Sequence, residues 1–188
     1  MNKGRLEAFT DGVMAIIITI MVLEIKVQHG SSFNDLLVLI PVFLSYILSF
    51  VYIGIYWNNH HHLMQAAKKV NGRVLWCNLH LLFWLSLIPF ASGWMGENSF
   101  EKNTLALYGF LLLMSSIAYR MLQRTVIRAN KDLELDKIFQ KDFKGKISPV
   151  IYLLGIGLSW VNTWMAGGCF FIVALLWLIP DKRIERVL

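Results

Sequence analysis

The sequence predicts an all-α, polytopic membrane protein with six transmembrane helices in a single domain, residues 1–188. Hydrophobic residues make up 56% of the chain and charged residues only 16%, which is too apolar for a soluble domain. Long uncharged runs alternate with short polar segments, and a helical crossing needs about 20 apolar residues. The basic residues also gather in alternate connecting segments, as is typical of membrane proteins.

The first predicted span, Leu6–Val27, has more polar side chains in its first turns than a simple anchor would have. An ionisable group at the centre of a membrane helix costs about 2.5–3.5 kcal/mol by insertion scales. Asp11 therefore requires a polar partner or a water-filled path. One face of this helix forms a stripe at helical spacing, which consists of Gly12, Ile16, Thr19, Ile20 and Leu23.

Thr19 is the one hydroxyl in this otherwise apolar stripe, and the spacing allows two interpretations. The hydroxyl can bond back to the carbonyl of Ala15 while the residue faces another helix, as is common for threonine in membrane helices. Alternatively, Thr19 faces a path for ions. The residue pattern alone does not decide between these two.

The next two spans are predicted at Leu36–Trp57 and Val74–Met95. The second span has no charge and contains Pro41, which we expect to kink the helix because proline removes a backbone hydrogen bond. The third span carries the polar residue Asn78 and also contains a proline, Pro89.

The fourth span begins near Thr104 and is apolar to Tyr119, and its helical pattern then continues to Arg128. We therefore expect this helix to project beyond the bilayer. A charged connector is predicted at residues 131–146.

The uncharged run from Ile147 to Pro180 is too long for one crossing. A single helix of this length would extend about 50 Å, whereas the apolar core of a bilayer is about 30 Å thick. Two helices that turn between Asn162 and Gly168 fit better, which brings the prediction to six spans.

The distribution of Lys and Arg predicts that both termini are cytoplasmic and that the protein crosses the cell membrane several times. With this orientation, all basic residues except Lys26 and Lys102 lie in cytoplasmic segments. The formal net charge of +6 therefore reflects orientation in the membrane, and we expect no nucleic-acid partner.

The sequence lacks the usual signatures of an enzyme or a cofactor site. It contains no glycine-rich phosphate loop, no evident Ser-His-Asp order and no paired-cysteine zinc pattern. The consecutive histidines 60–62 point about 100° apart on a helix, so they do not converge on a metal. The Thr-Val-Gly-Tyr-Gly filter of common potassium channels is also absent.

A polar cluster is predicted near the cytoplasmic ends of the first three spans, because the start of span one, the end of span two and the start of span three share one depth. Carboxylate, guanidinium and imidazole groups at one depth can form charge-assisted hydrogen bonds. The cluster is expected to hold the three helices together, and the other face of the first helix is free to line a path. Its candidate members are Arg5, Thr10, Asp11, His60, His61 and Asn78.

At these residues the chain resembles the prokaryotic branch of the transmembrane protein 175 family of potassium channels. The family form is Arg-x-x-x-Phe-Ser-Asp, and Thr10 stands here where serine is usual. The residues that match this first-helix motif are Arg5, Phe9, Asp11, Gly12, Val13, Ala15, Ile16 and Thr19. Further agreement comes from Trp57 with His60 and His61, and from Asn78, Ser86, Leu87, Pro89 and Phe90.

The resemblance implies a homotetramer in the lipid bilayer that conducts potassium ions through a central pore lined by the first helix, without a carbonyl filter. It assigns the constriction to Ile16, continued by Ile20 and Leu23, and selectivity to Thr19. It also adds Phe9 to the polar network formed by the other motif residues. No cofactor is expected.

Two other functions remain open from the residues. A proton-coupled secondary transporter would use Asp11 and a histidine as a proton relay, although no internal repeat is visible in the chain. A membrane metalloenzyme would need the histidines to bind a metal.

Overall fold

The computed structural model describes residues 2–26, 29, 31–130 and 143–178. All regular elements in these ranges are helical, which confirms the all-α class, and they form six helical stretches that correspond to the six predicted spans. In chain order the elements are α1 (Lys3–Leu23), the 3₁₀ helix η1 (Phe33–Leu39), α2 (Ile40–Ala66), α3 (Gly72–Ser86), α4 (Ile88–Glu97), α5 (Lys102–Ala129), α7 (Phe143–Leu158) and α8 (Thr163–Leu178).

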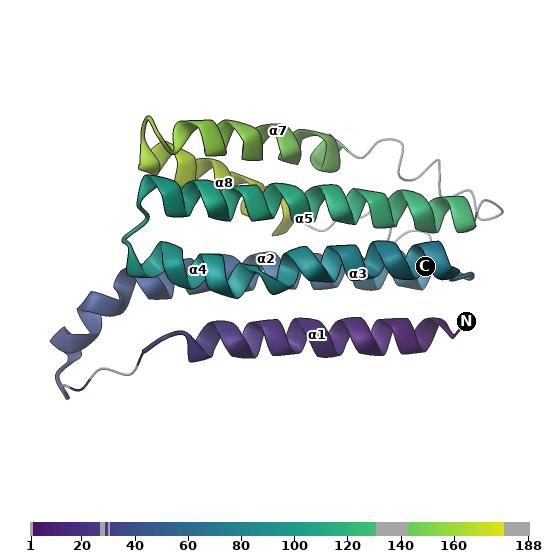
Figure 1. Ribbon diagram of the computed structural model, residues 1–188, viewed down its shortest axis with the longest axis horizontal. Helices are drawn as coiled ribbons and strands as arrows, with labels where there is room; N and C mark the ends of the chain where they lie inside the picture. Colours follow the sequence, from purple (N-terminus) through teal and green to yellow (C-terminus); the bar gives the residue numbers. More distant parts are fainter. Residues whose placement is uncertain (1, 27–28, 30, 131–142, 179–188) are drawn as a thin grey trace.

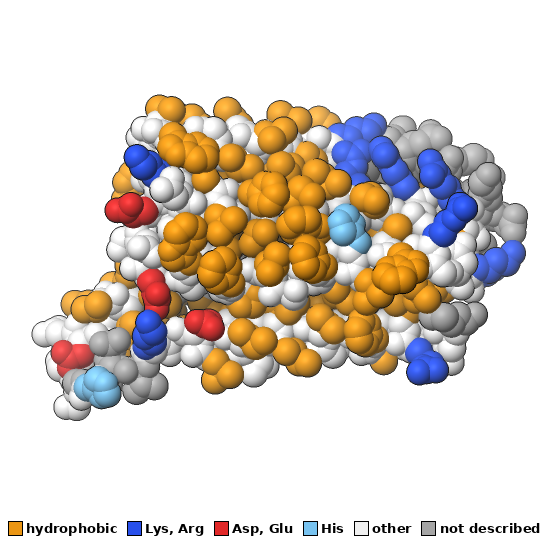
Figure 2. Space-filling view, in the orientation of Figure 1, with side chains coloured by type: hydrophobic (Ala, Val, Ile, Leu, Met, Phe, Trp, Pro, Cys, Tyr) orange, Lys and Arg blue, Asp and Glu red, His pale blue; other side chains and the backbone are white. Residues whose placement is uncertain are grey.

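The lengths of the helices and the distribution of apolar and basic side chains on the surface both fit a protein that crosses a membrane. Four stretches of the described chain are long and apolar enough to cross one, namely Lys3–Leu23, Phe33–Ala66, Gly72–Glu97 and Lys102–Ala129. On the face shown in Figure 2, hydrophobic side chains cover the middle of the molecule and most Lys and Arg gather at one end. We call this the basic end. It contains the start of α1, the turn between α2 and α3, the end of α5 and the start of α7.

The first helix lies at the edge of the bundle (Figure 1) and is shifted from its prediction, because it begins at Lys3 rather than Leu6 and ends at Leu23 rather than Val27. Its main contacts are with α2, α3 and α4. The side chain of Asn2 caps its first turn by accepting a hydrogen bond from the N–H of Gly4 at 2.9 Å. This position leaves one long side of α1 uncovered by the other described residues of the chain.

The second span differs from its prediction at both ends, since α2 continues to Ala66 rather than ending at Trp57. Ser32 and Asp35 form a capping box that starts η1, and α2 follows from Ile40. Pro41 lies in the first turn of α2, where its missing N–H costs nothing. The expected kink inside the span is therefore replaced by a junction between a 3₁₀ helix and an α-helix.

The third span is divided into α3 and α4 at Leu87. Pro89 stands in the first turn of α4, and the break before it fits a residue that has no backbone N–H and whose ring crowds the preceding turn. Farther along α4, Gly96 crosses α2 closely, because a Cβ atom there would lie 2.7 Å from the Cα of Val42. The glycine thus allows α2 and α4 to pack backbone to backbone.

The fourth span continues through Arg128, as predicted, and its end is tied to the turn between α2 and α3. The buried side chain of Asn130 accepts the N–H groups of Lys68 and Lys69 at 2.9 and 2.7 Å. Its amide group also donates to the carbonyl of Val126 at 2.9 Å. One side chain therefore fixes the turn against the end of α5.

The last two helices are confirmed, but the turn between them is displaced from its predicted site. It occupies residues 159–162, and Gly167 and Gly168 lie inside α8. The side chain of Asn162 caps α8 by accepting the N–H of Trp164 at 2.9 Å. The predicted connector was also too long, since residues 143–146 form the first turn of α7 and residues 131–142 lie outside the described chain.

The second half of the bundle packs around Phe170 of α8. A Cβ atom on Gly109 of α5 or Gly155 of α7 would lie 2.4 or 2.6 Å from the Phe170 ring, so only glycine fits at these two positions. The carbonyl of Phe170 accepts the hydroxyl of Tyr52 at 2.6 Å. These contacts join α2 to α5, α7 and α8, and the last three lie on the side of the molecule away from α1 (Figure 1).

Candidate functional site

The predicted stripe of α1 faces away from the other helices of the chain. The side chains of Ile16, Ile20 and Leu23 are 59%, 42% and 75% exposed. A Cβ atom built on Gly12 meets nothing within 4 Å, and Thr19 is also exposed. The opposite face of α1 supplies the buried residues Leu6, Thr10, Met14, Ile17 and Met21. The helix thus has one face in the bundle and one continuous face outside it.

The Thr19 side chain bonds back to the backbone of its own helix, as threonine commonly does. Its hydroxyl donates to the carbonyl of Ala15 at 2.9 Å. Thr19 does not face another helix of the protomer, because it is exposed on the outer stripe. Since the back-bond uses the hydroxyl proton, the lone pairs of the oxygen point away from the helix axis and can meet a cation.

The inner face of α1 is joined to two helices by a chain of buried hydrogen bonds. The amide Nδ2 of Asn78 on α3 donates to Oγ1 of Thr10 at 2.8 Å. Oδ1 of Asn78 lies 2.9 Å from Nε2 of His60 on α2. Because Oδ1 can only accept, the proton of His60 is on Nε2. All three side chains are at most 1% exposed, so this chain of bonds lies in the protein core.

A second contact, at the exposed edge of α1, joins Asp11 to α2. The indole Nε1 of Trp57 donates to Oδ1 of Asp11 at 2.9 Å. The His61 ring stacks on the Trp57 ring with a centroid separation of 5.9 Å and an interplanar angle of 15°. The sequence prediction left Trp57 out of the network, although an indole N–H at the depth of Asp11 was a usable signal.

Arg5 and Phe9 lie outside both sets of contacts. Both residues are exposed, and Arg5 has no hydrogen bond or ion pair within the described ranges. The expected pairing of Arg5 with Asp11 is not present in the protomer. Six residues of helix rotate a side chain by 600°, so the two groups point about 120° apart and lie about 9 Å apart along the axis.

Both ends of α1 are anchored to the bundle. At the basic end, Nζ of Lys3 donates to the carbonyls of Met64 and Ala67 at the C-terminus of α2, at 3.0 and 3.2 Å. Beyond the other end, Lys26 forms an ion pair with Glu97, the last residue of α4. The hydrogen bond and charge of Glu97 raise the pKa of Lys26 above its ordinary value. The outer stripe therefore belongs to a helix that is held at both ends.

The contacts of Asp11 set the effect that we expect for Asp11→Ala. The change removes one hydrogen bond to a charged acceptor, about 1.5–3 kcal/mol, rather than a buried ion pair. We expect a moderate loss of thermal stability in detergent, measured by unfolding of the purified protein. Asp11→Asn keeps a neutral acceptor for Trp57 and should therefore lose less stability than Asp11→Ala. Equal losses in the two variants would show that the negative charge, not the hydrogen bond, is what matters.

Nothing in the described ranges resembles a metal centre, since no three His, Cys, Asp or Glu side chains are close enough to hold an ion. The histidines instead contact polar and aromatic neighbours: His60 contacts Asn78, His61 contacts Trp57, and His80 accepts the indole N–H of Trp84 at 2.9 Å. What the geometry offers is a helix with an anchored inner face and an apolar outer face that carries one hydroxyl.

The sequence is similar to those of known channel proteins. Residues 5–89 match the family model described as endosomal/lysosomal potassium channel TMEM175. A potassium channel of Chryseobacterium sp. (strain P1-3) is 56% identical over 189 residues, which cover 100% of this chain and 98% of that protein. The endosomal/lysosomal proton channel TMEM175 of Gallus gallus is 33% identical over 103 residues, 48% of this chain and 21% of that protein.

A solved structure has the same fold. The crystal structure of a lysosomal potassium-selective channel TMEM175 homolog from Chamaesiphon minutus superposes with a TM-score of 0.81 at 28% sequence identity. The match covers 94% of this chain and 96% of that one.

Proposed function

Because this chain belongs to the TMEM175 family of potassium channels, we propose that four copies assemble around a central pore and that α1 of each copy lines it. The chain is a multi-pass membrane protein of an ion-channel family, not an enzyme. In this proposal the basic end faces the cytoplasm, in keeping with the positive-inside rule.

The observation that carries the proposal is the outer stripe of α1. A protomer with no internal repeat and a peripheral helix cannot enclose a path alone, whereas a cyclic assembly brings the same helix from each copy to one axis. The anchors at Lys3 and Lys26 and the buried contact of Thr10 hold the opposite face against the protomer. The stripe is then the face that turns towards the axis.

The constriction is proposed at Ile16, with Ile20 and Leu23 continuing the apolar lining towards the other end of the pore. Four isoleucine side chains around an axis form a narrow apolar neck, and water leaves such a neck when it is closed. Ions do not cross a dewetted neck, so a small outward movement of α1 that admits water would open the path. This gate needs no backbone carbonyls.

Selectivity is proposed at Thr19, one turn from Ile16. Four hydroxyl oxygens around the axis would replace part of the hydration shell of a passing cation. The back-bond to Ala15 supports this role because it fixes the proton on the helix side of each oxygen. The backbone carbonyls of α1 remain in helical hydrogen bonds.

We expect Thr19→Val to reduce discrimination between potassium and sodium, since valine keeps the shape of threonine and removes only the oxygen. A tenfold drop in the permeability ratio corresponds to about 1.4 kcal/mol. The measurement is the reversal potential under bi-ionic potassium and sodium. Thr19→Ser retains the oxygen and is the matched control. An unchanged reversal potential in Thr19→Val, with current still flowing, would assign Thr19 to helix packing alone.

The test of the proposed function is single-channel recording of the purified protein in planar bilayers, with potassium on one side and sodium on the other. A potassium channel gives unitary current that is ohmic near the reversal potential, and that potential shifts towards the potassium equilibrium. Saturable flux that follows an imposed proton gradient would instead support the alternative, a proton-coupled secondary transporter that uses Asp11 and a histidine.

A further inference from the structure

The outward side of α5 changes from apolar to basic at one point along the helix. Ile117 and Met121 are exposed hydrophobic residues, and Arg124 and Arg128 are exposed one and two turns farther on. The four positions follow one helical face, at i, i+4, i+7 and i+11. Up to Met121 this face can contact lipid acyl chains, and from Arg124 onwards it can bind anions.

Arg124 and Arg128 are not balanced by carboxylates in the surrounding helices. Neither α5 nor α7 contains an Asp or Glu residue. Within the described ranges, Arg124 and Arg128 make no hydrogen bond or ion pair. Long cationic side chains at such a position extend towards the headgroup region of a membrane.

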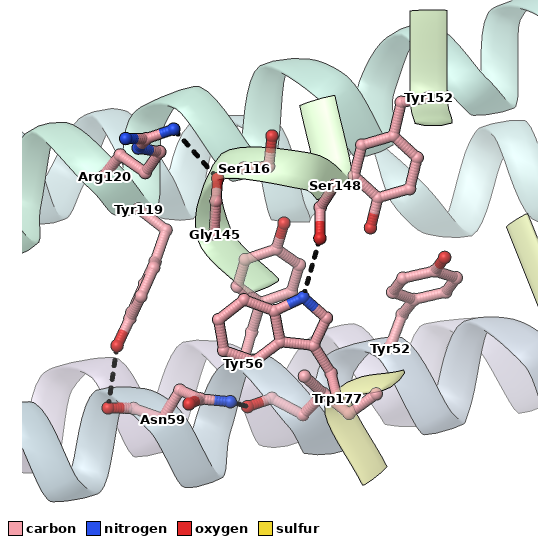
Figure 3. Close-up of a pocket in the computed structure, with 11 residues that line it drawn as sticks. Tyr52, Tyr56, Asn59, Ser116, Tyr119, Arg120, Gly145, Ser148, Tyr152 and Trp177 are labelled. Carbon is pink, nitrogen blue, oxygen red and sulfur yellow. Dashed lines mark hydrogen bonds between the residues drawn. The ribbon is translucent and has the colours of Figure 1, made fainter. Parts of the chain in front are cut away.

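Arg120 lies one turn before Arg124, on the side of α5 that contacts α7, and borders a cavity between α2, α5, α7 and α8. Its guanidinium is half-buried and donates through Nη1 to the carbonyl of Gly145 at 2.9 Å. The hydroxyl-bearing side chains of Tyr56, Ser116 and Tyr152 lie around the same space (Figure 3). The cavity volume is about 30 Å³, enough for one or two water-sized groups and not for a whole ligand.

We propose that α5 and α7 form a binding site for an anionic phospholipid at the basic end of the bundle. The phosphate lies against Arg124, with Arg120 and Arg128 on either side, and a polar group of the glycerol region reaches the cavity. The acyl chains follow the exposed apolar side chains of α5 and α7, among them Met121 and Val150.

The apolar part and the basic part of this surface together favour a phospholipid over a soluble anion. Clusters of Lys and Arg next to a membrane helix attract anionic lipids, by about 1 kcal/mol for each basic residue. A soluble phosphate would use the arginines but would leave the adjacent apolar stripe without a role. The inference depends on the chain spanning a membrane and not on which helix lines the pore.

The test is a lipid titration of the purified full-length protein in detergent, followed by thermal unfolding and by native mass spectrometry. Phosphatidylglycerol should stabilise the protein more than phosphatidylcholine does. Arg124→Gln/Arg128→Gln should weaken phosphatidylglycerol binding by roughly 30-fold, because two contributions of about 1 kcal/mol are lost. Both residues are exposed, so the unliganded variant should unfold at the wild-type temperature.

The matched control removes the same charge at the same end of the molecule. Lys68→Gln/Arg73→Gln alters the turn between α2 and α3 and the start of α3, which do not line the cavity. This variant should retain most of the affinity. Equal losses in the two double variants would overturn the site, since they would indicate diffuse attraction by the whole basic end. Equal stabilisation by phosphatidylcholine, or by glycerol phosphate at the same concentration, would overturn the assignment to an anionic lipid.

Discussion

Replacing Asn78 by leucine is expected to give the largest loss of stability among single changes in the polar contacts of α1. The side chain bonds Thr10 on α1 and His60 on α2 at the same time, and all three groups are buried. Leucine would leave a hydroxyl and an imidazole N–H without partners. Each buried unsatisfied group costs roughly 1–3 kcal/mol, and alternative partners in the unfolded membrane state reduce that cost. We expect a total of about 2–3 kcal/mol.

The measurement is thermal unfolding in detergent together with the yield of assembled protein. Asn59→Leu is the matched control, because the Asn59 side chain bonds only to the carbonyl of Ile55 on its own helix, at 2.7 Å. In a double-mutant cycle, Thr10→Val combined with Asn78→Leu should cost less than the sum of the two single changes. Additive costs would mean that the bond between Thr10 and Asn78 contributes little to the docking of α1.

Periodicity along one helix was enough to predict the stripe of α1. The 3.6-residue repeat fixes which side chains share a face, and the polar residues near the N-terminus indicate which turns need partners. The predicted polar cluster puts Arg5 and Asp11 near the same depth in the membrane, which suggested that they pair. The rotation of the helix between them puts the two side chains on different faces, so they do not bond. The depth of Trp57 marked its indole N–H as a candidate partner of Asp11, but the rotation of α2 that brings the two side chains together is not fixed by the sequence.

The boundaries of the later helices were harder to predict because their sequence has no charges. Between Ile147 and Pro180, the pair Gly167–Gly168 suggested a turn, yet membrane helices tolerate glycine well. Asn162 was the better signal, because its side chain caps the first turn of α8. Pro41 and Pro89 fall inside the predicted spans, but in the structure both stand in the first turn of a helix rather than within one, so the kink expected at Pro41 is absent.

The role of the predicted pore residues depends on an assembly that a single protomer does not contain. Exposure of Ile16 is expected both for a pore-lining and for a lipid-facing side chain, since either environment lies outside the protomer. The two cases differ in what a polar substitution does. In a pore it changes permeation, whereas in lipid it changes insertion and folding.

We expect Ile16→Asn to raise the potassium current of the channel by at least about tenfold at a fixed voltage. The amide side chains would hold water in the constriction, so the free-energy barrier that a dewetted neck presents to an ion would fall. A tenfold change corresponds to about 1.4 kcal/mol off the barrier. The current should be measured in planar bilayers and divided by the amount of assembled protein in the same preparation.

Ile47→Asn on α2 is the matched control, because Ile47 is the same residue type and is 49% exposed, compared with 59% for Ile16. A polar side chain there should lower yield without altering unitary current. For Ile16→Asn, the current per assembled channel distinguishes the two environments. If yield falls while that current stays at the wild-type level, Ile16 faces lipid and the constriction must be formed by other residues. A rise that accompanies normal yield would assign the neck to Ile16, because only a side chain in the conduction path can change the barrier without changing assembly.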